Sequence, residues 1–149
     1  MDKGIYCLVF RNPGCTVTIG ALGEIAFRRG WHLYVGSALG SGGLARLRRH
    51  IALAERKDKP PKWHVDHLLT SNQFILRYTV AAITTEPLEC SLARAIGGNC
   101  VSGFGSSDCD CPSHLFFRQS NPVGGVEQAF RNLGLVPATT LMSREHRKG

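Results

Sequence analysis

Three side chains in one part of the sequence are of the types that act on phosphate esters. Arg46 and His50 are four residues apart, which places them one above the other on one face of a helix. Tyr34 belongs to a short predicted strand just before that helix, across the glycine-rich segment SALGSGG. An arginine can neutralise charge on a phosphate, and a histidine or a tyrosine can move a proton. On spacing alone a solvated basic helix face is the favoured interpretation, and phosphate-ester chemistry is the alternative.

A carboxylate on a later helix could complete such a site. Glu89 stands in the first turn of a predicted helix that contains ECSLARAI, at the edge of its apolar stripe. A carboxylate at this position interacts favourably with the helix dipole, which requires no ligand. One carboxylate can also hold Mg²⁺ when waters and a phosphate supply the other ligands. Taken by itself, the position of Glu89 favours the interaction with the helix dipole, and the metal ligand is the alternative.

Predicted strands and helices alternate along the chain, and these elements must position the candidate residues. Strands are predicted at residues 4–10 and 32–37 and in the segments FILRYTVAAITT and HLFF, with a hairpin arm in TVTIGALGEIAF. Helices are predicted at residues 43–56 and in the segments EPLECSLARAIGG, with Thr85 as its N-cap, and VGGVEQAFRNLG. The segment KWHVDHLL is predicted to be a short helix or irregular. This order predicts an α+β domain at residues 1–137 and a mobile basic tail at residues 138–149.

The composition favours a nucleic-acid partner. The 149 residues carry a formal net charge of +7, and clustered Lys and Arg side chains release counterions from phosphates when they bind. No apolar run approaches the roughly 18 residues of a membrane span, and the N-terminus has no signal-peptide pattern. We therefore expect a cytoplasmic protein with no membrane partner. Its six cysteines are expected to be thiols in that compartment.

Several blocks of the sequence together resemble the GIY-YIG nuclease superfamily. GIY stands at residues 4–6 and YVG at residues 34–36, before the helix with Arg46 and His50. The segments YVGSALGSGGLARLRRH, KWHVDHLL, ECSLARAI and GFGSSDCDCPSHLFF are similar to the small stand-alone prokaryotic branch labelled Uri-superfamily endonuclease. The resemblance extends from about residue 4 to residue 118 and depends on the order of the blocks, since GIY or YVG alone carries little information.

The resemblance implies a central, mainly antiparallel sheet with a three-stranded core and an inserted strand pair, flanked by helices. It also implies metal-dependent hydrolysis of phosphodiester bonds in DNA, with RNA as an alternative substrate, and the site residues Tyr6, Tyr34, Arg46, His50 and Glu89. Arg48 and Arg49 are alternates for Arg46. Tyr34 is the expected proton acceptor for the attacking water, with Tyr6 as its hydrogen-bonding partner and His50 as the rival base. Glu89 is the expected ligand of Mg²⁺ or Mn²⁺.

One departure from the superfamily pattern opens an alternative function. The superfamily commonly places an asparagine after the glutamate, whereas the nearest asparagine here is Asn99, closer to Glu89 than the pattern requires. A catalytically weak nucleic-acid-binding module on the same scaffold, lent to a repair protein, is therefore the second hypothesis.

The segment GFGSSDCDCPSH offers further polar side chains. Ser107, Asp108 and His114 are predicted to shape the site, and turn chemistry alone is the alternative. A zinc site on Cys109, Cys111 and His114, with His64 or His67 as the fourth ligand, would make the protein an interaction domain, but this spacing is cramped. The other residues predicted to shape the site are Gly36, Arg49, His64 and Asp66. Trp63 is predicted either to pack against the core or to stack on a base.

Overall fold

The computed structural model describes residues 1–105 and 113–142, and its centre is an antiparallel sheet with the strand order β6-β4-β1-β5-β7. The strands are β1 (Gly4–Asn12), β4 (Gly30–Ala38), β5 (Ile75–Ile83), β6 (Leu115–Arg118) and β7 (Ala138–Leu141). The helices of the described residues are α1 (Ala45–Arg56), α2 (His64–Leu69), α3 (Glu89–Ile96) and α4 (Val123–Asn132). The α+β class and the antiparallel sheet predicted from the sequence are confirmed, and β6 and β7 extend the sheet to five strands.

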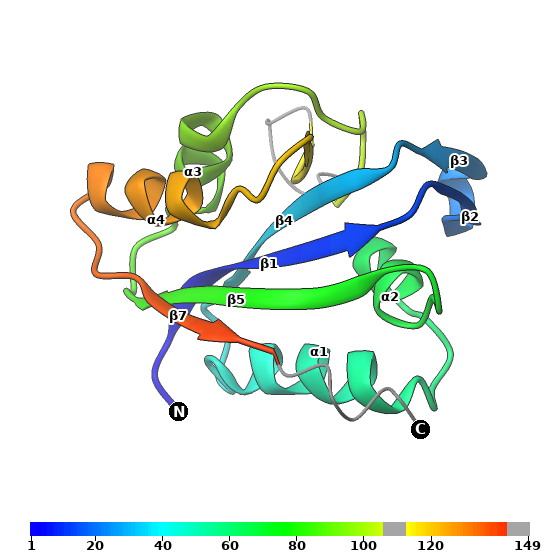
Figure 1. The fold of residues 1–149 in the computed structure, drawn as a ribbon. Helices are drawn as coiled ribbons and strands as arrows, with labels where there is room; N and C mark the ends of the chain where they lie inside the picture. The colour runs from blue at the N-terminus through cyan, green and yellow to red at the C-terminus, as the bar shows by residue number, and fades with distance from the viewer. Residues whose placement is uncertain (106–112, 143–149) are drawn as a thin grey trace.

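The alternation of side chains along β1 divides the core into two clusters. Ile5, Cys7 and Val9 join the buried residues of α3 and α4. Tyr6, Leu8 and Phe10 point to the opposite face, because successive side chains of a strand alternate; there they pack with residues of α1 and α2. Figure 1 shows the two helix pairs on opposite sides of the sheet. Tyr6 is therefore fixed on the face that α1 covers.

The chain between β1 and β4 contains the inserted strand pair that the sequence predicts. The strands β2 (Cys15–Thr18) and β3 (Glu24–Phe27) form a separate two-stranded sheet around a short 3₁₀ turn at Gly20–Leu22. Because this hairpin leaves the main sheet and returns, β1 and β4 still pair directly, from Gly4 opposite Ala38 to Asn12 opposite Gly30.

The two ends of α1 are held by specific contacts. At its start, Gly43 has a positive φ of 56°, and a Cβ atom there would collide with the carbonyl oxygens of Met1 and Asp2. At its end, Lys57 adopts the left-handed conformation, and its Nζ donates to the carbonyl oxygens of Leu69 and Ser71 at 2.7 and 2.8 Å. These contacts fix the helix that carries Arg46 and His50 against the start of β1 and the end of α2.

Two sequence-based predictions are wrong in detail. The tail does not begin at residue 138, because Ala138–Leu141 forms β7 and pairs with β5; residues 143–149 lie outside the described residues. Thr85 is not the N-cap of α3, which begins at Glu89 after Leu88. The neighbouring Thr84 instead accepts a hydrogen bond from the backbone N–H of Glu86, which makes a turn before the helix.

No helix in the described ranges has the length and apolar character needed to cross a membrane.

Candidate functional site

A cavity of about 480 Å³ brings together all five site residues implied by the resemblance. Tyr6 and Tyr34 come from the paired strands β1 and β4, Arg46 and His50 from α1, and Glu89 from the first position of α3. The remaining lining residues are Ser37, Lys62, Trp63, His64, Gly105 and His114. We refer to this cavity as the tyrosine pocket.

Gly36 gives the Tyr6 ring its place in this pocket. The two residues are directly opposite each other in the β1–β4 pair, and a Cβ atom on Gly36 would lie 2.5 Å from Cζ of Tyr6. Only a residue without a side chain lets the ring occupy this position, because real Cβ atoms do not approach other atoms so closely. Gly36 therefore leaves the space that the Tyr6 ring occupies.

Tyr6 and His50 form a buried hydrogen-bonded pair. The Tyr6 hydroxyl lies 2.8 Å from Nε2 of His50, and both side chains are almost completely buried. Burial lowers the pKa of His50 to about 4, an effect that the Asp66 carboxylate opposes, and it raises the pKa of Tyr6 above its ordinary value. At neutral pH the imidazole is therefore uncharged and can accept the proton that the hydroxyl donates.

Arg46 is the arginine that faces the pocket. Its Nη1 donates to the carbonyl oxygen of Ser37 at 3.1 Å, and its guanidinium lies 5.1 Å from the ring centroid of Trp63. Arg48 and Arg49, the alternates considered from the sequence, are exposed and do not line the tyrosine pocket. Arg46 thus presents a positioned positive charge where a phosphate could enter.

Tyr34 lies in an environment that keeps its hydroxyl protonated. Burial raises its pKa, the charge of Glu89 raises it further, and Arg46 lowers it. The mechanism implied by the resemblance needs the opposite direction, because a phenolate is required to take a proton from water. In the protein alone, the Tyr34 hydroxyl is a hydrogen-bond donor.

Glu89 enters the pocket beside His114. Oε2 of Glu89 is 3.4 Å from Nδ1 of His114, and the Glu89 side chain is 27% exposed whereas that of His114 is 2% exposed. Burial lowers the pKa of His114, so that at neutral pH a carboxylate faces an uncharged imidazole. His114 therefore lies beside Glu89 without neutralising its charge.

The donor set around Glu89 is compatible with a cation that a phosphate helps to bind. Mg²⁺ commonly takes one or two carboxylates and fills its other positions with water and substrate oxygens, and Glu89 supplies one accessible carboxylate. Among residues 1–105 and 113–142, no group of three or more His, Cys, Asp or Glu side chains is arranged to hold a metal by itself. The predicted zinc ligands Cys109 and Cys111 and the predicted site-shaping residues Ser107 and Asp108 lie outside the described residues.

The other predicted site residues divide between the pocket and its surroundings. His64 lines the pocket, where its Nδ1 accepts the backbone N–H of Gly105 at 2.8 Å. Asp66 does not line it, because its carboxylate accepts the backbone N–H groups of Lys62 and Trp63 at 2.8 and 3.1 Å and so caps α2. The residue types did not mark this cap, because tryptophan is not one of the residues that usually occupy the N-cap position. Ser37 and Lys62, which line the pocket, were also missed.

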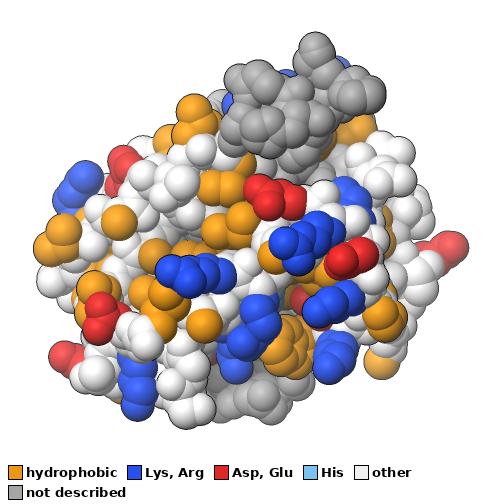
Figure 2. All heavy atoms as spheres, turned by 90° about the horizontal axis from the view of Figure 1, so that it is seen from below, with side chains coloured by type: hydrophobic (Ala, Val, Ile, Leu, Met, Phe, Trp, Pro, Cys, Tyr) orange, Lys and Arg blue, Asp and Glu red, His pale blue; other side chains and the backbone are white. Residues whose placement is uncertain are grey.

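A second cavity of about 470 Å³ continues from the tyrosine pocket between α1 and α2. We call it the α1–α2 groove; it shares His50, Lys62 and Trp63 with the tyrosine pocket and is also lined by Arg49. Trp63 is 47% exposed, so its ring is available to a ligand rather than packed in the core. Figure 2 shows Lys and Arg side chains gathered on this side of the molecule, and those that line the groove are Arg49, Arg56, Lys59 and Lys62.

Comparison with curated proteins and with solved structures found no match. A family model matches residues 5–135, which include β1 through α4 and every described residue of the tyrosine pocket. The family is described as a domain of unknown function, and it carries no activity over to this chain. Because the match covers most of the sequence, the chain belongs to the family "Domain of unknown function DUF123".

Proposed function

We propose that this protein is a divalent-metal-dependent endonuclease that hydrolyses phosphodiester bonds in DNA. The observation that carries the proposal is the tyrosine pocket itself. Two strands and two helices, far apart in the sequence, bring two tyrosines, an arginine, a histidine and a glutamate to one cavity. The net charge of +7 and the basic α1–α2 groove support a polyanionic substrate. The proposed membership in the GIY-YIG superfamily, and in its Uri branch, rests on the resemblance of the sequence blocks.

In this proposal Arg46 and Tyr34 bind the scissile phosphate. The Arg46 guanidinium is held by Ser37 and by the ring of Trp63, so it can offer its remaining N–H groups to phosphate oxygens. The protonated Tyr34 hydroxyl donates a hydrogen bond to the same group. Both contacts strengthen as negative charge develops on the phosphate oxygens, and this preference for the transition state accelerates the reaction.

The Tyr6–His50 pair is the proposed proton acceptor. A water that attacks the phosphorus must lose a proton, and Tyr6 can take it on its oxygen while passing its own proton to Nε2 of His50. This relay requires no free phenolate before the reaction, whereas Tyr34 as the base would require one against the effect of burial. The relay leaves a proton on His50, which burial opposes and the Asp66 carboxylate favours, and the 2.8 Å hydrogen bond to Tyr6 supports this residue, the rival base of the sequence analysis, in the proposed role.

Glu89 would hold Mg²⁺ or Mn²⁺ through its carboxylate, which lies beside His114. When bound, such a cation would act as a Lewis acid that stabilises charge on the phosphate and on the leaving oxygen. Its positive charge would also offset the effect of Glu89 on the pKa of Tyr34.

The proposal is tested by incubating the purified protein with plasmid, single-stranded and branched DNA, in Mg²⁺, in Mn²⁺ and in chelator. We expect cleavage of at least one substrate that requires the metal and is lost in a Glu89→Gln variant. Absence of cleavage under every condition, together with salt-sensitive binding, would instead support the nucleic-acid-binding module. Cleavage by the Glu89→Gln variant at the parent rate would refute the proposed metal site.

A further inference from the structure

We propose that a second pocket, built by Arg11, Arg29 and Arg77 at the far end of β1, binds a phosphate group. This arginine pocket has a volume of about 470 Å³ and shares no lining residue with the tyrosine pocket. Arg11 is five residues after Tyr6 on β1, which separates the two pockets by about 16 Å along the strand. The ligand comes either from a nucleic-acid backbone or from a small phosphate compound.

A β-bulge places Arg77 in this pocket. Val9 of β1 pairs with Tyr78, but the next residue, Phe10, pairs with Leu76. Arg77 is therefore an extra residue of β5 with no partner on β1. Such bulges redirect a side chain away from the regular alternation of a strand, and they occur frequently beside binding sites.

The Arg77 side chain has a buried donor without an acceptor. Its Nε is inaccessible to solvent and makes no hydrogen bond to any described residue. A buried N–H group left without a partner costs free energy that a bound acceptor would recover. The Arg77 side chain lines the arginine pocket, so a rotation that turns Nε towards the cavity would let a bound anion supply the missing acceptor.

The charges of the pocket point to an anion. Arg11, Arg29 and Arg77 line it without any carboxylate, and none of them forms an ion pair within residues 1–105 and 113–142. Three guanidinium groups around one cavity repel each other unless a negative charge lies between them. Neutral amides of Asn72 and Gln73 also line the pocket and can supply further hydrogen bonds.

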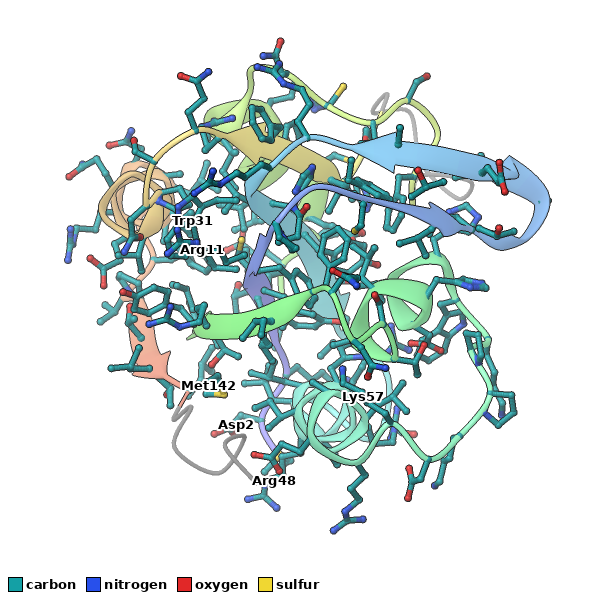
Figure 3. The ribbon with its side chains drawn as sticks, turned by 45° about the vertical axis from the view of Figure 1, so that its right-hand side comes forward. Asp2, Arg11, Trp31, Arg48, Lys57 and Met142 are labelled. Carbon is teal, nitrogen blue, oxygen red and sulfur yellow. The ribbon has the colours of Figure 1, made fainter. Side chains whose placement is uncertain are left out.

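A phosphate suits this arrangement better than a single carboxylate does. A guanidinium binds two oxygens of one phosphate in a fork, and a phosphate has enough oxygens to contact several arginines at once. Arg11 is already oriented, because its guanidinium lies 5.6 Å from the ring centroid of Trp31 on the neighbouring strand. Figure 3 labels these two residues next to each other. Arg29 lies just before β4 and is exposed, so it can close on the ligand from the outer side.

The first test follows the Nε–H signal of Arg77 by NMR while inorganic phosphate is added to the metal-free protein. We expect this signal to shift and to saturate. Arg77→Lys keeps the charge but removes Nε, and it should weaken phosphate binding at least about fivefold. Arg29→Gln should have a comparable effect, and it keeps the test valid if the change in β5 disturbs folding. Arg131→Gln, on the exposed side of α4, is the matched control and should leave the affinity unchanged.

The second test distinguishes the two sources of phosphate. Binding of an oligonucleotide is measured in chelator at several salt concentrations, so the result does not depend on cleavage or on the proposed endonuclease activity. If the ligand is a nucleic-acid backbone, the Arg29→Gln/Arg77→Lys double variant should lower the slope of log affinity against log salt by about one. If it is a small phosphate compound, only the affinity for inorganic phosphate should fall. Unchanged phosphate affinity in both single variants would overturn the proposal.

Discussion

Gly36 of β4 lies opposite Tyr6 of β1, and the space that a side chain at Gly36 would occupy is filled by the tyrosine ring. The ring in turn places its hydroxyl 2.8 Å from Nε2 of His50 on α1. Two short sequence motifs, GIY and YVG, are thus explained by one contact across a strand pair. The glycine of the second motif accommodates the tyrosine of the first, and the resulting pair is the proton acceptor in the proposed mechanism.

Gly36→Ala should therefore damage both stability and activity. The added methyl group must displace the Tyr6 ring, at a cost of about 1–3 kcal/mol of unfolding free energy. It should also lower the cleavage rate about 100-fold by misplacing the Tyr6–His50 pair. Urea unfolding and a plasmid-cleavage assay measure the two effects. Gly40→Ala is the control, because no atom lies within 4 Å of its Cβ position. Equal behaviour of the two variants would contradict the assigned role of Gly36.

Tyr34→Phe should abolish cleavage while leaving the fold intact. The change removes a hydroxyl that is proposed to donate to the phosphate, and losing such a donor costs about 100-fold or more in rate. The thermal unfolding midpoint should change little, because the ring remains in place. Tyr78→Phe is a matched control, since its hydroxyl accepts a hydrogen bond from Asn121 outside the tyrosine pocket. If the Tyr34→Phe variant cleaves DNA at the parent rate, the Tyr34 hydroxyl does not take part in the reaction and Tyr34 is an ordinary strand residue of β4.

Glu89→Gln should greatly reduce the metal-dependent cleavage of DNA. The amide keeps the shape of the side chain but lacks the charge that a cation needs, so cleavage should fall at least about 100-fold. Calorimetric titration with Mn²⁺ in the presence of a non-cleavable oligonucleotide should show a corresponding loss of binding. Glu86→Gln is the control, because Glu86 is exposed, lies three residues earlier and does not line the pocket.

The free energy of unfolding should decrease as the pH falls from 7 to 4.5. The pKa values of His50 and His32 are lowered by burial from 6.5 to about 4, so the unfolded chain binds protons in this range that the folded protein does not. The stability is fully present above pH 6.5 and is lost as the pH falls towards 4. Each histidine should contribute about 2–3 kcal/mol to the decrease.

Urea unfolding at both pH values measures this decrease, and His50→Gln or His32→Gln should reduce it by the contribution of one histidine. His50→Gln should also slow cleavage at neutral pH, whereas His32→Gln should not, because His32 is outside the tyrosine pocket. A decrease that neither variant alters would mean that other groups control the acid response.

Trp63→Ala should weaken binding of single-stranded DNA about tenfold and binding of paired DNA much less. Its 47% exposed ring lies between the tyrosine pocket and the α1–α2 groove, where an unpaired base can stack on it. Fluorescence anisotropy in chelator measures both affinities without cleavage. Trp63→Phe keeps an aromatic surface and should restore most of the single-strand affinity. Equal losses for both kinds of DNA would indicate that Trp63 acts by supporting Arg46.

The sequence predicted those parts of the fold that local pattern determines. The stripe of Leu44, Leu47 and Ile51 packs against the sheet on the helix that was expected there. The strand β7 was missed because ATTL is short and lies exposed at the edge, without the alternation that marks a half-buried strand. The bulge at Arg77 was missed for a related reason, since a register shift depends on the partner strand and leaves no trace in the residue types of β5.

The candidate site was predictable as a set of residues but not as a chemical environment. Motif order selected Tyr6, Tyr34 and Glu89, and the helical spacing selected Arg46 with His50. Burial is a property of the assembled core, so the sequence could not reveal that both tyrosine pKa values are raised while that of His50 is lowered. The role of Asp66 as a helix cap likewise became visible only with the hydrogen bonds around α2.

The register between β1 and β4 also determines whether a folded molecule contains the Tyr6–His50 pair. A shift of one residue between these strands would turn Tyr6 to the side of α3 and α4 and expose Ile5 to the tyrosine pocket. Such molecules would keep most of their sheet content and still lack the Tyr6–His50 pair. Circular dichroism would not detect such molecules, because their sheet content is nearly unchanged. Titration of active sites in a refolded sample would detect them, and the fraction of active molecules would measure how often the chain forms the correct strand register.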